Sequence, residues 1–149
     1  MAETELPRIL CVDDEVNILS ALRRQMRSKF NITTAGGGTE ALELMKAEDP
    51  FDVIISDYRM PHMDGAEFLK QAKALDPSAT RILLTGQASL EQVQATVNEG
   101  GIYKILLKPV SREELHEAIY GAVELNCDKK SASNQLGDQF DELLKSLAP

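Results

Sequence analysis

Five side chains suited to phosphoryl chemistry each follow a short apolar run of the sequence. Asp13 and Asp14 follow the first run, Asp57 the third, Thr85 the fourth and Lys108 the fifth. In open parallel sheets, functional groups gather beyond the carboxyl ends of the strands. If the apolar runs are such strands, three carboxylates, a hydroxyl and an ammonium converge at one edge of the sheet.

The charges at this predicted edge do not balance. Three ionised carboxylates close together repel one another and one lysine cannot neutralise them, so either some carboxyls are protonated or a cation is bound. Oxygen ligands without His or Cys suit Mg²⁺, which takes one or two carboxylates and keeps waters. In phosphoryl chemistry at such sites a carboxylate can act as nucleophile and form an aspartyl phosphate, whose oxygens the metal, a lysine and a hydroxyl would hold.

The elements that must position these groups are visible in the hydrophobic pattern. Runs rich in Ile, Val and Leu, about five residues long as buried strands are, cover residues 8–12, 31–35, 52–56, 81–84 and 103–107. Between and after them, apolar residues recur at helical spacing. Ser89 and Ser111 have the spacing of helix-capping residues with Gln92 and Glu114.

This strand–helix alternation occurs five times. It predicts an α/β fold with a parallel sheet, right-handed crossovers and helices on both faces.

The motifs at the ends of the predicted strands resemble those of the response-regulator receiver domain. The resemblance covers about residues 6–126 and rests on four pieces in order: Asp13-Asp14, Asp57-Tyr-Arg-Met-Pro-His-Met-Asp64-Gly65, Leu-Leu-Thr85-Gly86 and Lys108-Pro109. It implies a five-stranded, doubly wound flavodoxin-like (βα)5 sheet in the order 2-1-3-4-5.

The resemblance also implies a role for each matching residue. Asp57 is then the phosphoacceptor, and Asp13 and Asp14 are the Mg²⁺-binding acidic pair. Asp57 and the backbone carbonyl of Arg59 complete the protein ligands of the metal. Thr85 is the switch hydroxyl and Lys108 contacts the phosphoryl group.

Further expectations concern the bond after Lys108 and the lifetime of the phosphoryl group. The Lys108–Pro109 bond is similar to one that is cis in the family, and proline lowers the cost of that geometry. Arg59 and Gln87 flank the path of the hydrolytic water and are expected to tune the lifetime. The chain departs from the family at Ile105, where an aromatic switch residue is common; Tyr103 lies two positions earlier.

The function expected from these residues is a signalling switch of a two-component system, not a metabolic enzyme. A sensor histidine kinase or phosphotransfer protein would phosphorylate Asp57, and the charge would change the face built from the fourth helix, the fifth strand and the fifth helix. The partners would be an output domain or effector protein. The rival interpretation is a Mg²⁺-dependent aspartyl-phosphate phosphatase, but adjacent Asp13 and Asp14 do not match the Asp-x-Asp motif that it requires.

Composition excludes other classes. A net charge of −8 argues against direct nucleic-acid binding. No apolar run approaches the roughly 20 residues that span a bilayer, so no membrane role is expected. Residues 1–7 are acidic and lack a secretory apolar segment, which predicts a cytoplasmic protein.

Residues 127–149 are predicted to be a linker and a short amphipathic helix. Leu136, Phe140, Leu143, Leu144 and Leu147 recur at helical spacing, and a helix of about three turns needs a surface to dock on. Docking within the chain, contact with a partner and formation of a homodimer are the alternatives.

Three features beside the site motifs favour structural interpretations. Glycines 36–38 lack the lysine of a phosphate loop, His62 is a lone loop histidine, and Asp64 precedes a helix as an N-cap does.

Overall fold

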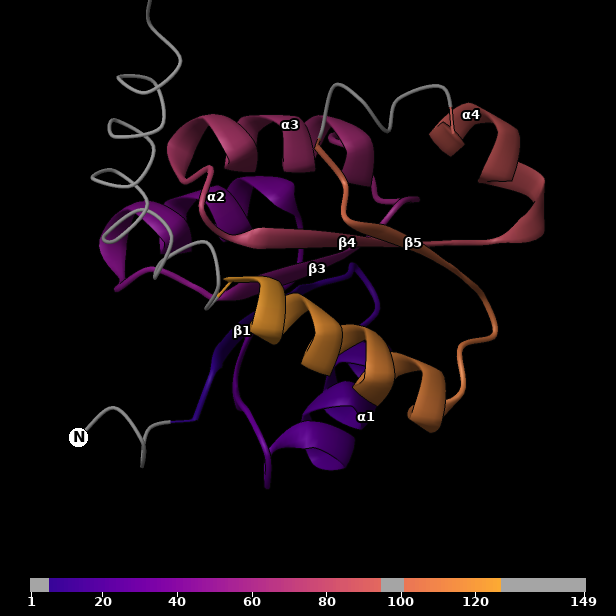
Figure 1. The fold of residues 1–149 in the computed structure, drawn as a ribbon. Coiled ribbons are helices and arrows are strands. Elements are labelled where there is room, and N and C mark those ends of the chain that lie inside the picture. Colours follow the sequence, from indigo (N-terminus) through magenta and orange to yellow (C-terminus); the bar gives the residue numbers. More distant parts are fainter. Residues whose placement is uncertain (1–5, 95–100, 127–149) are drawn as a thin grey trace, which may run out of the picture.

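The structure is a computed structural model that describes residues 6–94 and 101–126 of the 149-residue chain. Five parallel strands form one sheet in the order β2-β1-β3-β4-β5 (Figure 1). The strands are β1 (Arg8–Val12), β2 (Asn31–Ala35), β3 (Val53–Asp57), β4 (Thr80–Thr85) and β5 (Lys104–Leu107). The predicted fold class and strand order are confirmed.

Helices cover both faces of this sheet (Figure 1). Helix α1 (Val16–Met26) and the helix of residues 112–126 lie on one face. Helices α2 (Gly38–Ala47), α3 (Gly65–Leu75) and α4 (Leu90–Gln94) lie on the other. A 3-10 turn, η2 (Gln87–Ser89), leads into α4.

Strand alternation divides the interior into two apolar cores. In β1, Ile9 and Cys11 face the core shared with α1, while Leu10 and Val12 face the core shared with α2 and α3. All four are at most 2% exposed, as expected for a parallel sheet buried on both faces.

Three predicted strands, at residues 52–56, 81–84 and 103–107, differ from the structure by one residue at one or both ends, and two of these differences matter for the site. Strand β3 extends through Asp57 and β4 through Thr85, because Asp57 pairs with Leu84 and Thr85 with Leu107. Both side chains are therefore held by sheet pairing, not carried on the loops that follow.

The structure tests some predictions at the helix ends. The Ser111 hydroxyl accepts a hydrogen bond from the Glu114 N–H at 3.1 Å, which confirms that cap. The predicted linker and amphipathic helix of residues 127–149 lie outside the described residues, as do residues 95–100. Among the helices that the structure describes, none is long and apolar enough to cross a membrane.

Candidate functional site

Sheet pairing brings the three predicted carboxylates together at the carboxyl end of the central strands. Strand β1 pairs with β3 so that Val12 lies opposite Ser56, which places Asp13 beside Asp57. One ligand oxygen each from Asp13, Asp14 and Asp57 lies within 4.8 Å of the others. Asp13 is 3% and Asp57 7% exposed, whereas Asp14 is exposed at the rim.

The buried Asp13 carboxylate is only half satisfied. Its Oδ1 accepts a hydrogen bond from the Glu15 N–H at 2.9 Å, but its Oδ2 is buried with no hydrogen-bond partner. Burial raises the pKa of Asp13 from 3.8 to about 6, and the negative charges of Asp57 and Asp14 add to the increase. A buried oxygen without a donor, beside two further carboxylates, is suited to a cation.

Lys108 supplies one positive charge to the cluster. Its Nζ forms an ion pair with Asp57 Oδ1. The Lys108 N–H donates to the Thr85 carbonyl at 2.8 Å, which continues the pairing of β4 with β5 and aims the lysine at the site. The Lys108–Pro109 peptide bond is cis.

Thr85 completes the predicted set. It is 1% exposed at the end of β4, and its hydroxyl donates to the Gly86 carbonyl at 3.3 Å. Ile105 packs against the core that contains Val93 of α4, while Tyr103 is 42% exposed. The position of the common aromatic switch is thus filled by an aliphatic contact.

The donor set fits a small divalent cation. Three carboxylates and a single ammonium leave excess negative charge, and the oxygens are hard ligands of the kind that Mg²⁺ prefers. Asp13, Asp14 and Asp57 are the side chains that would hold it. The same cluster offers a carboxylate nucleophile, Asp57, with a cation already at its side.

Arg59 lies in the loop after β3, and Gln87 begins the 3-10 turn η2. Both side chains are exposed, but the Arg59 Nε donates a hydrogen bond of 2.8 Å to Ser89 Oγ. Ser89 is 1% exposed. The sequence predicted it only as a helix cap and gave no indication of its contact with Arg59. Its contact joins positions 30 apart, so no local spacing could have indicated it.

The loop after β3 is fixed by a cap and a close approach. The Asp64 side chain accepts a hydrogen bond from the Glu67 N–H at 2.8 Å, which confirms its role as the N-cap of α3. Gly65 lies against the end of β3: a Cβ there would meet the Asp57 carbonyl oxygen and lie 2.9 Å from Tyr58 Cα. His62 is exposed, with a φ of 70°.

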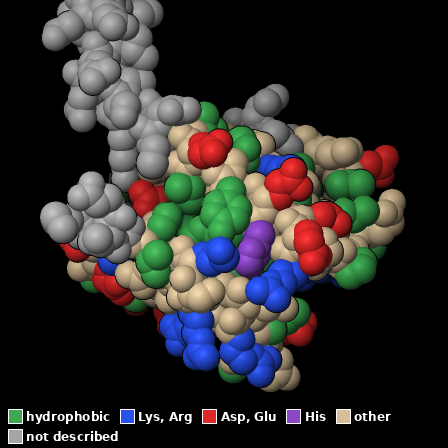
Figure 2. All heavy atoms as spheres, turned by 60° about the horizontal axis from the view of Figure 1, so that its bottom comes forward, with side chains coloured by type: hydrophobic (Ala, Val, Ile, Leu, Met, Phe, Trp, Pro, Cys, Tyr) green, Lys and Arg blue, Asp and Glu red, His purple; other side chains and the backbone are tan. Residues whose placement is uncertain are grey.

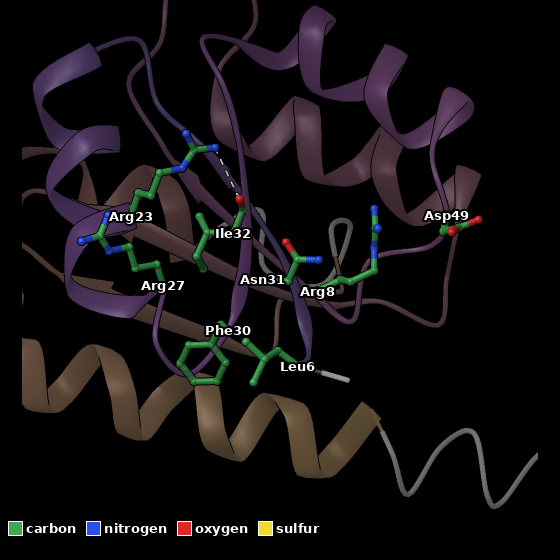
Figure 3. A pocket seen from close by; sticks show the side chains of 8 residues that line it. All are labelled: Leu6, Arg8, Arg23, Arg27, Phe30, Asn31, Ile32 and Asp49. Carbon is green, nitrogen blue, oxygen red and sulfur yellow. Dashed lines mark hydrogen bonds between the residues drawn. The ribbon is translucent and has the colours of Figure 1, made fainter. Parts of the chain in front are cut away.

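A basic cavity lies at the opposite ends of the strands. It measures about 680 Å³ and its lining includes Arg8, Arg23 and Arg27, whose guanidinium groups point in different directions (Figure 3). Arg8 forms an ion pair with Glu48 at 3.3 Å, and Arg23 donates to the Ile32 carbonyl at 3.4 Å.

Lys and Arg side chains also gather on the surface around the end of α1 (Figure 2). Because the guanidinium groups in the cavity do not converge, the carboxylate cluster remains the better candidate for a chemical site.

Comparison with known proteins gives a consistent result. The family model described as "Response regulator receiver domain" matches residues 9–120. The hydrogenase transcriptional regulatory protein HoxA of Bradyrhizobium diazoefficiens is 39% identical over 117 residues, which are 78% of this chain and 24% of that protein. The chain therefore spans about a quarter of that regulator.

Two solved structures share the fold. A response regulator receiver domain protein from Clostridium thermocellum has a TM-score of 0.75 and 31% identity, covering 80% of this chain and 95% of that one. A chain described as adenylate cyclase from Rhodopirellula baltica has a TM-score of 0.83 and 34% identity, covering 89% and 98%. With the family model matching most of its length, the chain belongs to the response regulator receiver domain family.

Proposed function

We propose that Asp57 accepts a phosphoryl group, with Mg²⁺ held by Asp13, Asp14, Asp57 and the backbone carbonyl of Arg59. The observation that carries this proposal is the Lys108–Asp57 ion pair inside a cluster of three carboxylates. An isolated Asp57 would be a weak nucleophile for an anionic phosphoryl donor. The negative charges of the carboxylate and of the donor repel each other, and cations beside Asp57 reduce this repulsion.

The residues have distinct parts in the transfer. An Asp57 carboxylate oxygen attacks the phosphorus of a phosphohistidine, the P–N bond breaks, and its electron pair remains on the imidazole nitrogen. Lys108 then holds a phosphoryl oxygen, and Thr85 can turn its hydroxyl from the Gly86 carbonyl toward another. Bound Mg²⁺ supplies the charge neutralisation that the transferring group requires.

A groove beside Lys108 supports an exchange of phosphoryl groups with a protein partner. It has a volume of about 500 Å³, and its mainly apolar lining includes Ile18 and Leu22 of α1 together with Lys108, Pro109 and Val110. We infer that a helix of the histidine kinase or phosphotransfer protein packs here, which would bring its phosphohistidine to Asp57.

We propose that phosphorylation controls a partner in the way that is typical of two-component regulators. The chain acts as a switch whose phosphorylation alters the face of α4, β5 and the helix of residues 112–126 for an output domain or effector protein. Arg59 and Gln87, both exposed, would tune the lifetime of the phosphoryl group.

Phosphorylation by a small donor tests the proposal. Incubation with acetyl phosphate and Mg²⁺ should add about 80 Da to the intact mass, the mass of one PO₃ group. Asp57→Asn should abolish the adduct. Asp64→Asn is the matched control, because asparagine also caps helices and Asp64 is the cap of α3; it should be phosphorylated as the wild type is.

Two results would contradict the proposal. An adduct that persists in Asp57→Asn would place the acceptor elsewhere. Sustained turnover of p-nitrophenyl phosphate that depends on Asp57 would favour a phosphatase over a switch.

A further inference from the structure

The turn that begins α4 is held by two groups that also lie next to the phosphoacceptor. The Gly86 carbonyl accepts hydrogen bonds from the Thr85 hydroxyl at 3.3 Å and from the Ser89 N–H at 3.1 Å. On its other side, Ser89 Oγ accepts from Arg59 Nε at 2.8 Å. Thr85 ends β4 and Arg59 is two residues beyond Asp57. The turn is therefore bonded to the loop after β3 through Arg59, and it follows directly on the end of β4.

Ser89 is fixed by burial, whereas the exposed Arg59 side chain can change its hydrogen-bond partner. Ser89 is 1% exposed, and Val93 of α4 is fully buried one turn later. The Arg59 side chain is exposed and reaches across the surface to Ser89. Displacing an exposed arginine costs little packing energy, so this hydrogen bond can be exchanged without disturbing the core.

A phosphoryl group on Asp57 would compete for Arg59. It adds a charge of about −1.5 to −2 and three acceptor oxygens, two residues from Arg59. A guanidinium can bind such an anion through two parallel hydrogen bonds, each between opposite charges, whereas its bond to Ser89 is single and has a neutral acceptor. The Ser89 hydroxyl is a neutral, single acceptor and is the weaker partner.

We propose that Arg59 is a positioning residue that couples the phosphoacceptor to α4. While Asp57 is unphosphorylated, Arg59 holds residues 86–89 through Ser89; on phosphorylation it leaves Ser89 for the phosphoryl oxygens. Thr85 would leave the carbonyl of its neighbour Gly86 at the same time, so two hydrogen bonds of the turn would be exchanged together. With Ile105 in the position of the common aromatic switch, this contact gives the chain another route from the site to α4.

This inference rests on the proposed function for its release step, but not for its holding step. The holding step is tested without phosphate, by amide hydrogen exchange over residues 86–94 of the full chain. Arg59→Met and Ser89→Ala should each speed exchange about three- to tenfold, as expected for the loss of one hydrogen bond. The double variant should exchange no faster than either single variant, because both remove the same contact. Gln92→Ala, an exposed change on α4, is the control.

The release step is tested with acetyl phosphate and Mg²⁺, with the mass adduct confirming phosphorylation. Phosphorylation of the wild type should speed exchange of residues 86–94, and in Arg59→Met the increase should be less than half as large. Arg59 is exposed, so this variant should fold even if Ser89→Ala does not.

Specific outcomes overturn each part. Unchanged exchange in Arg59→Met, or additive effects in the double variant, would show that Ser89 acts through packing alone. A phosphorylated wild type with unchanged exchange would refute release. A wild type that gains no mass would refute the proposed function and the release step with it, and the unphosphorylated arm would still decide whether Arg59 holds the turn.

Discussion

Replacing Asp13 with asparagine should make the metal-free protein more stable at neutral pH. Burial raises the pKa of Asp13 from 3.8 to about 6. Because the folded state then binds the proton more tightly than the unfolded state, the unfolding free energy falls as pH rises from about 4 to 6 and stays low above that. A difference of about 2 pKa units corresponds to about 3 kcal/mol at neutral pH.

The change should recover part of this free energy. The neighbouring Asp14 is exposed, so water reaches the rim of the site and we expect a gain of about 1–3 kcal/mol for Asp13→Asn at pH 7.5. The asparagine Oδ1 can still accept from the Glu15 N–H, which preserves the local turn. Near pH 4 the gain should largely disappear, because the wild-type carboxyl is then protonated in the fold.

Urea unfolding at several pH values, in EDTA and in Mg²⁺, measures this effect. At a Mg²⁺ concentration ten times Kd the wild type should gain about 1.4 kcal/mol, and Asp13→Asn should gain much less. Asp49→Asn, an exposed carboxylate before β3, is the control and should change stability by less than about 0.5 kcal/mol. A variant no more stable than the wild type in EDTA at pH 7.5, or a gain independent of pH, would refute the reasoning.

Three further perturbations test the packing beside the site, the burial of the core beneath it and the charge within it. Gly65→Ala should lower the unfolding free energy by about 2–3 kcal/mol and slow phosphorylation, because its Cβ meets the backbone at the end of β3; Gly37→Ala, with nothing within 4 Å, should be near neutral in the same thermal melts. Burial raises the pKa of the Cys11 thiol to about 12, so in a Cys127→Ser background thiol reagents should label Cys11 only on unfolding, and rapid labelling of native protein would contradict its burial. Lys108→Met removes the cation beside the carboxylates and should tighten Mg²⁺ binding about three- to tenfold by calorimetry; unchanged affinity would show that the lysine does not compete with the metal.

The strands could be predicted because their signal is local. Buried parallel strands need near-continuous Ile, Val and Leu, and the four runs that precede the site residues have this composition, whereas residues 31–35 contain a single Ile. Since parallel strands end at a common edge, the convergence of Asp13, Asp57 and Lys108 followed from chain order alone. The exact strand ends did not, because pairing of Asp57 with Leu84 depends on the neighbouring strand and not on the apolar run.

Contacts between distant surface positions could not be predicted. Ser89 has the same spacing to Gln92 that a helix cap has, and nothing near it in the sequence indicates Arg59 as a partner. The unpaired Oδ2 of Asp13 is equally invisible, because it depends on how closely the following turn covers the carboxylate. Both features require three-dimensional packing.

The unpaired Asp13 Oδ2 and the Arg59–Ser89 contact explain how binding at this small site can change the stability and the helix contacts of the whole fold. The fold holds Asp13, Asp14 and Asp57 together against their mutual repulsion, with one lysine to offset it. Such an arrangement costs stability when empty, and binding of a cation therefore returns free energy to the fold. A phosphoryl group on Asp57 would add to this negative charge, and in the proposed switch its oxygens would bind the Thr85 hydroxyl, Lys108 and Arg59, which come from separate elements. Arg59 bonds to Ser89 and the Thr85 hydroxyl bonds to the Gly86 carbonyl, both in the turn before α4, so in the proposed switch a charge on Asp57 would change how that turn is held.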